Sequence, residues 1–221
     1  PFMNPQIMLM LEDSLRRGFE VLVLTNAMKP MLKCSDQLLQ LLQTYGQKLI
    51  LRVSIDHYGQ ALHEQERGAR SWAPMVEGLR WLSDHGFHIA AAGRTLWSDD
   101  EAELRSGYRR LFATEGISIN ADSPSQLILF PEMDEHVDVP EITTACWGIL
   151  DQSPDDVMCS SSRMVVRRKG ADTPVVLSCT LLPYDEAFEM GTSLAAASTP
   201  VNLNHPHCAK FCVLGAASCS A

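Results

Sequence analysis

The sequence predicts an α/β protein in which helices cover a parallel sheet, followed by a small cysteine-rich part. Over the first 130 residues, four short apolar runs alternate with amphipathic stretches. Strands that are apolar throughout are typical of parallel sheets buried on both faces. Beyond residue 131 the composition changes, and five of the seven cysteines lie after residue 158. We therefore expect two parts with different architectures.

The composition fits a globular protein and excludes several classes of function. Of 221 residues, 46% are hydrophobic and 20% are charged. The net charge of −9 argues against binding to nucleic acid, whose phosphates require a basic face. The charge-free apolar stretches are too short to cross a bilayer, so we expect no membrane association. An odd number of cysteines without an export signal favours a reducing compartment, and we expect a cytoplasmic protein.

The four apolar runs are expected to be buried strands because each is short and rich in aliphatic residues. In chain order they cover residues 20–26, 48–56, 87–94 and 126–130.

The stretches between these runs predict helices, since their apolar residues recur at helical spacing. The expected N-cap residues of the four helices are Asn4, Ser35, Ser71 and Ser98. Ser98 would form a capping box with Glu101. Glycines at 18, 46 and 86 end the first three helices. A repeat of this length suits either a barrel or a doubly wound sheet.

Polar side chains gather where the predicted strands end. In parallel α/β folds, ligands bind at the carboxyl ends of the strands. No glycine-rich phosphate loop follows any strand, which gives no support to a dinucleotide site. We therefore predict a site for a polar small molecule there. Its candidate residues are Thr25, Asn26, Ser54, Asp56 and Arg94.

The second part begins after an acidic, proline-bounded linker at residues 131–142. Residues 159–179 predict a β-hairpin, because two β-branched runs flank a turn at residues 169–172. A hairpin brings its ends together, so Cys159 and Cys179 are expected to be neighbours. The remainder is expected to be loops with one short helix around Leu194.

The late cysteines predict a metal centre. The candidate ligands are Cys159, Cys179, Cys208, Cys212 and Cys219, whereas Cys34 and Cys146 are expected to be structural. Zinc takes four tetrahedral ligands, and His205 or His207 could complete a set for it. An iron–sulfur cluster prefers four thiolates. The spacing alone leaves both metals open.

Several segments together resemble the radical S-adenosylmethionine (SAM) superfamily. The opening "PFMNP" resembles the residues after Gly-Gly-Glu in the Gly-Gly-Glu-Pro motif, and "VLVLTNA" resembles the third barrel strand. "LRVSIDHY" followed by "HEQERG" resembles the fourth strand and the His-Asp/Glu-x-x-Arg-Gly stretch of members with a SPASM or twitch extension. The hairpin and the late cysteine pair resemble that extension, although the pair is spaced by three residues rather than two.

The resemblance implies a fold and a set of cofactors. Residues 1–135 would be a partial (β/α) TIM-like barrel, from the end of its second strand onward, and residues 136–221 the extension. The late cysteines would hold an auxiliary [4Fe–4S] cluster. Thr25, Asn26, Ser54 and Asp56 would bind or line the SAM site, and Arg94 would pair with its carboxylate. The Cys-x-x-x-Cys-x-x-Cys triad and Gly-Gly-Glu are expected upstream of Pro1, so the chain would be an inactive fragment, with the SAM-cleaving cluster only in the full-length protein.

The implied activity is the reductive cleavage of SAM to a 5′-deoxyadenosyl radical that takes hydrogen from a peptide or small-molecule substrate. The implied electron donor is a flavodoxin or ferredoxin. An alternative is a non-enzymatic zinc-binding module on an α/β scaffold. Individual residues also have plainer interpretations: Thr25 and Asn26 as a turn, Asp56 as a cap, and Arg94 in a surface ion pair.

Overall fold

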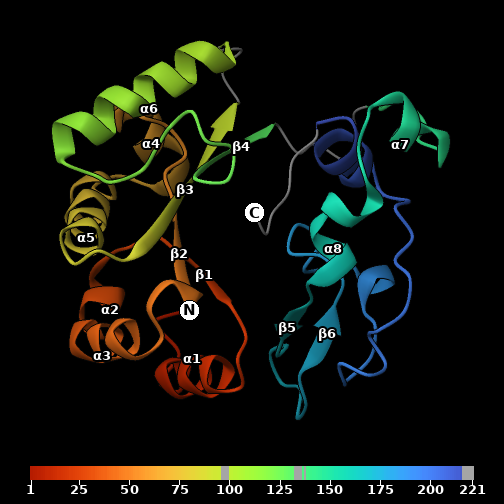
Figure 1. Ribbon diagram of the computed structural model, residues 1–221, viewed down its shortest axis with the longest axis horizontal. Helices are drawn as coiled ribbons and strands as arrows, with labels where there is room; N and C mark the ends of the chain where they lie inside the picture. Colours follow the sequence, from red (N-terminus) through yellow and green to blue (C-terminus); the bar gives the residue numbers. More distant parts are fainter. Residues whose placement is uncertain (96–99, 132–135, 137, 216–221) are drawn as a thin grey trace. The chain divides into compact units, whose positions relative to one another are not determined.

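The computed structural model describes residues 1–95, 100–131, 136 and 138–215. The chain divides into two compact units, Pro1–Glu132 and Met133–Ala221 (Figure 1). Among the described residues, no helix combines the length and the apolar character that a membrane crossing requires.

The first unit is built on a four-stranded parallel sheet, and its strands are those predicted from the apolar runs. They are β1 (Val21–Thr25), β2 (Leu49–Ser54), β3 (His88–Thr95) and β4 (Leu127–Pro131). Their order in the sheet is their order in the chain, with Leu51 paired to both Val23 and Ile89. Such sequential order is a feature of (β/α) barrels. Four strands form an open sheet, so the mixed α/β class is confirmed and the partial barrel stays a prediction.

The helices of the first unit connect these strands and lie along the sheet (Figure 1). They are α1 (Ile7–Arg16), α2 (Lys29–Leu32), α3 (Ser35–Tyr45), the short 3₁₀ helix η1 (Gly46–Lys48), α4 (Gln60–Arg67), α5 (Trp72–Asp84) and α6 (Glu101–Glu115). The four predicted helices are present. The sequence did not predict α2 and α4, and α4 carries two residues of the site described below.

Two helices begin later than predicted. The first helix starts at Ile7 because Asn4 Oδ1 accepts the N–H of Gln6, at 2.9 Å, which shapes the turn before the helix rather than its cap. The last starts at Glu101, where Asp100 Oδ1 accepts the N–H of Ala102 at 2.7 Å. Ser98, the predicted cap, lies outside the described residues.

The core forms between the sheet and its helices. Along β2, Leu49, Leu51 and Val53 are fully buried against the helices. Because side chains alternate between the two faces of a strand, Ser54 projects from the opposite face. Ser54, at the end of β2, is only partly buried and so remains accessible to a ligand.

The second unit contains the predicted hairpin. Its strands β5 (Met164–Val166) and β6 (Val175–Leu177) pair antiparallel, with Val165 opposite Val176. The remaining elements are the helices α7 (Ala145–Ile149) and α8 (Met158–Ser161), the 3₁₀ helices η2 (Pro154–Asp156) and η3 (Glu186–Phe188), and the π-helix η4 (Cys208–Val213). Cys159 lies on α8 and not on a strand, and the helix expected around Leu194 is a turn at residues 194–197.

Arg163 holds the loop-rich second unit together. Its guanidinium donates hydrogen bonds to the carbonyls of Cys159, at 2.6 Å, and of Ala197, at 2.9 Å. These two acceptors are 38 residues apart in the chain. One side chain thus ties the α8 segment, which carries Cys159, to the turn after residue 194.

Candidate functional site

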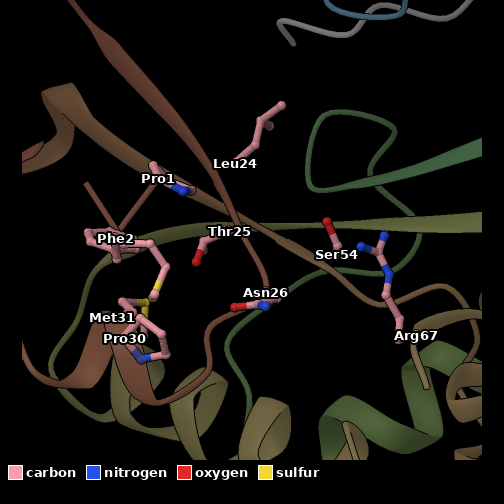
Figure 2. Close-up of a pocket in the computed structure, with 10 residues that line it drawn as sticks. Pro1, Phe2, Leu24, Thr25, Asn26, Pro30, Met31, Ser54 and Arg67 are labelled. Atoms are coloured by element: carbon pink, nitrogen blue, oxygen red, sulfur yellow. The ribbon is translucent and has the colours of Figure 1, made fainter. Parts of the chain in front are cut away.

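A pocket of about 280 Å³ opens at the carboxyl ends of β1 and β2. This volume is close to the lower end of pockets that bind small molecules. Three of the five predicted ligand-binding residues line it: Thr25, Asn26 and Ser54 (Figure 2). The other lining residues are Pro1, Phe2, Met3, Leu24, Pro30, Met31 and Arg67.

The pocket has an apolar side and a polar side. Figure 2 shows Phe2 and Met31 on one side, and Ser54 beside Arg67 on the other. Phe2 and Met31 are buried. Such a pocket suits a ligand that carries an apolar part and a charged or polar part.

The turn after β1 is held by the same side chains that line the pocket. Thr25 Oγ1 accepts the N–H of Ala27 at 3.1 Å, and Asn26 Oδ1 accepts the N–H of Met28 at 3.2 Å. Ala27 itself adopts a left-handed conformation, with φ of 56°. The turn interpretation of Thr25 and Asn26 is therefore correct, and it is compatible with a role in the pocket.

Asp56 is bound by two arginines instead of facing the pocket. Its side chain is buried, and Oδ2 lies 2.5 Å from Arg67 Nε while Oδ1 lies 2.9 Å from Arg67 Nη2. Arg94 Nε lies 3.4 Å from Oδ1. Both carboxylate oxygens are thus occupied by guanidinium groups, and Asp56 is not among the described residues that line the pocket. The side chain that it orients, Arg67, does line it.

Arg67 takes the position that the sequence analysis gave to Arg94. Arg94 does not line the pocket; besides Asp56 it pairs with Glu66, at 3.9 Å. Arg67 is the arginine of the "HEQERG" stretch and ends α4. Sequence reasoning missed it because α4 was not predicted, although the stretch itself had been singled out.

His63, on the same helix, is buried and packs edge-on against Trp72, with ring centroids 5.4 Å apart. Burial lowers the pKa of this imidazole, against a weaker opposing effect of the Asp56 carboxylate. The side chain therefore favours the neutral form. His63 is thus a buried residue of α4.

Three of the predicted metal ligands lie close together in the second unit. Burial raises the pKa of the Cys159 thiol, and the neighbouring Cys179 raises it further. Burial also raises the pKa of Cys208, to about 11, with smaller contributions from Cys179 and Cys159. Cys208 and Cys179 pack with Leu182 and Phe188 in a small apolar cluster. The expected proximity of Cys159 and Cys179 agrees with these interactions.

The described residues do not form a ready metal site. Within residues 1–95, 100–131, 136 and 138–215, no group of three or more His, Cys, Asp or Glu side chains is arranged to hold a metal ion. Cys212 shares the π-helix η4 with Cys208, and Cys219 lies outside the described residues. His205 and His207, the alternative zinc ligands, contact each other with ring centroids 4.6 Å apart. The ligand set of either metal thus stays a prediction.

Comparison with curated proteins finds a similarity over part of the chain. A segment of 92 residues in this chain is 35% identical to the antilisterial bacteriocin subtilosin biosynthesis protein AlbA of Bacillus subtilis (strain 168). This similarity supports the radical SAM superfamily. The match covers 41% of this chain and one fifth (20%) of that protein's length. No family model and no solved structure matches the chain.

The pocket lies next to two segments that carry the radical SAM resemblance. The two segments that resemble the superfamily's third and fourth strands are β1 and β2, and the pocket opens where they end. The assignment of the second unit to a SPASM or twitch extension is untested by the comparison.

Proposed function

We propose that this chain is part of a radical SAM enzyme and that the pocket at the ends of β1 and β2 binds SAM. The single observation that carries the proposal is the polar lining by Thr25, Asn26, Ser54 and Arg67 at the ends of two parallel strands. The partial similarity to AlbA supports it. When bound in the full-length protein, a reduced [4Fe–4S] cluster would supply the electron for the reductive cleavage of SAM.

The residues of the pocket fit the chemical groups of SAM. A guanidinium matches a carboxylate with two hydrogen bonds, so Arg67 is the residue we assign to the SAM carboxylate. Ser54, Thr25 and Asn26 carry hydroxyl and amide groups that suit the ribose hydroxyls. Phe2 and Met31 supply apolar surface on the other side of the pocket (Figure 2).

Asp56 orients Arg67 in this proposal. Arg67 has five N–H donors, and Asp56 accepts from Nε and Nη2. The remaining donors of the guanidinium stay available for a second carboxylate. Two negative and two positive charges meet here: the carboxylates of Asp56 and Glu66 and the guanidinium groups of Arg67 and Arg94. This charge neutrality lowers the free-energy cost of keeping the buried Asp56 ionised.

The auxiliary cluster remains part of the proposal, with Cys159, Cys179, Cys208 and either Cys212 or Cys219 as its ligands. The mutual influence of the first three thiols supports it. Metal binding must deprotonate these thiols, whose pKa burial raises, so the free energy of binding has to offset that cost.

Metal analysis tests the ligand set. After anaerobic reconstitution with iron and sulfide, we expect the chain to hold both elements, and Cys208→Ser to hold much less. Cys146→Ser is the matched control and should retain the wild-type content, because Cys146 is not in the predicted set. A colourless protein with one equivalent of zinc would instead favour the zinc-binding module.

The same resemblance also supports proposals for the substrate, the electron donor and the cellular compartment. The matched protein is named for the biosynthesis of a bacteriocin, which supports a peptide substrate for this one. We propose a flavodoxin or ferredoxin as the electron donor, and the cytoplasm as the compartment, since seven thiols suit reducing conditions.

The activity is tested on the protein that includes the SAM-cleaving cluster, because these 221 residues contain no Cys-x-x-x-Cys-x-x-Cys triad. Incubation with dithionite and SAM without oxygen should release 5′-deoxyadenosine and methionine. Arg67→Ala should raise the KM for SAM. Absence of 5′-deoxyadenosine from a protein that holds its iron would contradict the proposal.

A further inference from the structure

A second, much smaller cavity adjoins the main pocket. Its volume is about 40 Å³, and it shares Asn26, Ser54 and Arg67 with the main pocket. The other residues that line it are Met28, His63, Ser71 and Met75. The cavity therefore lies directly behind the polar side of the main pocket, toward α4 and α5.

Two buried polar atoms in the lining of this cavity have no hydrogen-bond partner among the described residues. They are Nδ1 of His63 and Oγ of Ser71. The two side chains belong to residues that are only 1% and 6% exposed. Buried polar groups in native proteins are almost always paired, and a pair of unsatisfied atoms in one small cavity points to a group that bonds to both.

The hydroxyl of Ser71 does not cap α5, although Ser71 is the N-cap residue of that helix. Ser71 precedes the first residue of α5, where a serine normally accepts a hydrogen bond from the start of the helix. Here its side chain makes no such bond, and Glu64 Oε1 accepts the N–H of Trp72 instead, at 3.2 Å. The hydroxyl, which lines the cavity, thus has no hydrogen-bond partner among the described residues.

The size and charge of the cavity restrict what it can hold. A water molecule takes up about 30 Å³ in the liquid, so a cavity of about 40 Å³ has room for a water-sized group. The nearby charge of Arg67 is already paired with Asp56. Besides this paired charge, the lining offers neutral hydrogen-bonding groups, which suit an uncharged group.

We propose that His63 and Ser71 form a binding site for one small, uncharged hydrogen-bonding group, which is a water molecule when the main pocket is empty. Such a water would have polar neighbours in Asn26 and Arg67 as well, which gives it the two to four partners that buried waters normally have. It would form the floor of the main pocket, and His63 would act on a ligand through it as a positioning residue. The inference does not depend on the ligand being SAM.

The direct test is a crystal structure of this chain without ligand, at a resolution that shows ordered water. We expect density for one water within hydrogen-bonding distance of His63 Nδ1 and Ser71 Oγ. An empty cavity, or one filled by a rotated side chain, would overturn the proposal. Because no SAM is present, this result is independent of whether the main pocket binds SAM.

A double-mutant cycle tests the same site in solution. A shared water couples the two side chains, so the losses in Tm from Ser71→Ala and His63→Phe should not add in the double variant. Ser83 provides the matched control, because its hydroxyl accepts the N–H of Ser118 at the other end of α5. The losses in Tm from Ser71→Ala and Ser83→Ala should add in the double variant. Additive losses for both pairs would contradict the shared site.

Discussion

Arg67 donates two hydrogen bonds to Asp56, from Nε at 2.5 Å and from Nη2 at 2.9 Å. This bidentate pair joins the segment after β2 to the end of α4. It fixes the planar guanidinium at the edge of the pocket and leaves it little rotational freedom. The position of Arg67, and with it the polar side of the pocket, therefore depends on Asp56.

Removing the charge of Asp56 should destabilise the protein. Asp56→Asn replaces a buried carboxylate with a neutral amide and takes the counter-ion from Arg67, whose side chain is 36% exposed, and we expect a loss of about 1–3 kcal/mol in the free energy of unfolding. Asp13→Asn is the control, because Asp13 pairs with Arg16 and Arg17 on the exposed surface of α1. Urea unfolding measures both, and equal effects would contradict the structural role of Asp56.

A methyl group at Gly78 should displace α5 from the turn after β1. A Cβ at this position would lie 1.7 Å from the carbonyl oxygen of Ala27, which is backbone and cannot rotate away. We expect Gly78→Ala to cost about 1–3 kcal/mol of stability and to weaken ligand binding, because Asn26 precedes Ala27. Thermal unfolding and a ligand titration measure the two effects.

The control for that substitution is Gly148→Ala on α7. Beyond its chain neighbours and the local helix backbone, no atom of the described residues lies within 4 Å of a Cβ built at Gly148. Alanine favours a helix over glycine, so this variant should gain about 0.5–1 kcal/mol. If Gly78→Ala and Gly148→Ala are equally stable, contact between the Cβ at position 78 and the carbonyl oxygen of Ala27 does not destabilise the protein.

Burial of His63 predicts a loss of stability in acid. The pKa of His63 is lower in the folded chain than its ordinary value of 6.5, chiefly because of burial. The unfolded chain therefore binds the proton more readily, and the contribution is complete above pH 6.5 and declines as the pH falls below it. His63→Gln should flatten the dependence of unfolding free energy on pH between 7 and 5. An unchanged slope would contradict the assignment.

The metal-free thiol of Cys208 should resist alkylation. Burial raises its pKa from 9.0 to about 11, and only the thiolate reacts. At pH 8 we expect iodoacetamide to modify Cys208 on the order of a hundredfold more slowly in the folded than in the urea-unfolded chain, as judged by peptide mass spectrometry. Equal rates in the two states would show that the thiol is not buried.

The strands could be predicted from the sequence, whereas the contacts of the site could not. The aliphatic run at residues 20–26 forms β1 as its β-branched and aliphatic residues predict, although Leu24 within it is exposed. By contrast, α4 contains few apolar residues, so its helical character and the burial of His63 follow from tertiary packing.

Tertiary packing also explains why Arg67 lines the pocket instead of the predicted Arg94. Both arginines contact Asp56, and only the folded chain shows which of them lines the pocket. The residue types that follow β1 and β2 were enough to predict Thr25, Asn26 and Ser54, because the ends of neighbouring parallel strands share one edge.

Calorimetric titration of SAM into this chain and into Arg67→Ala tests the central claim most directly. If the pocket binds SAM through Arg67, the wild-type chain should bind it and the variant should bind at least about tenfold more weakly, since one charged hydrogen-bonding partner is lost. Arg16→Ala, on the exposed face of α1, should bind as the wild type does. No measurable binding by the wild type, or equal affinity of the wild type and Arg67→Ala, would contradict the account.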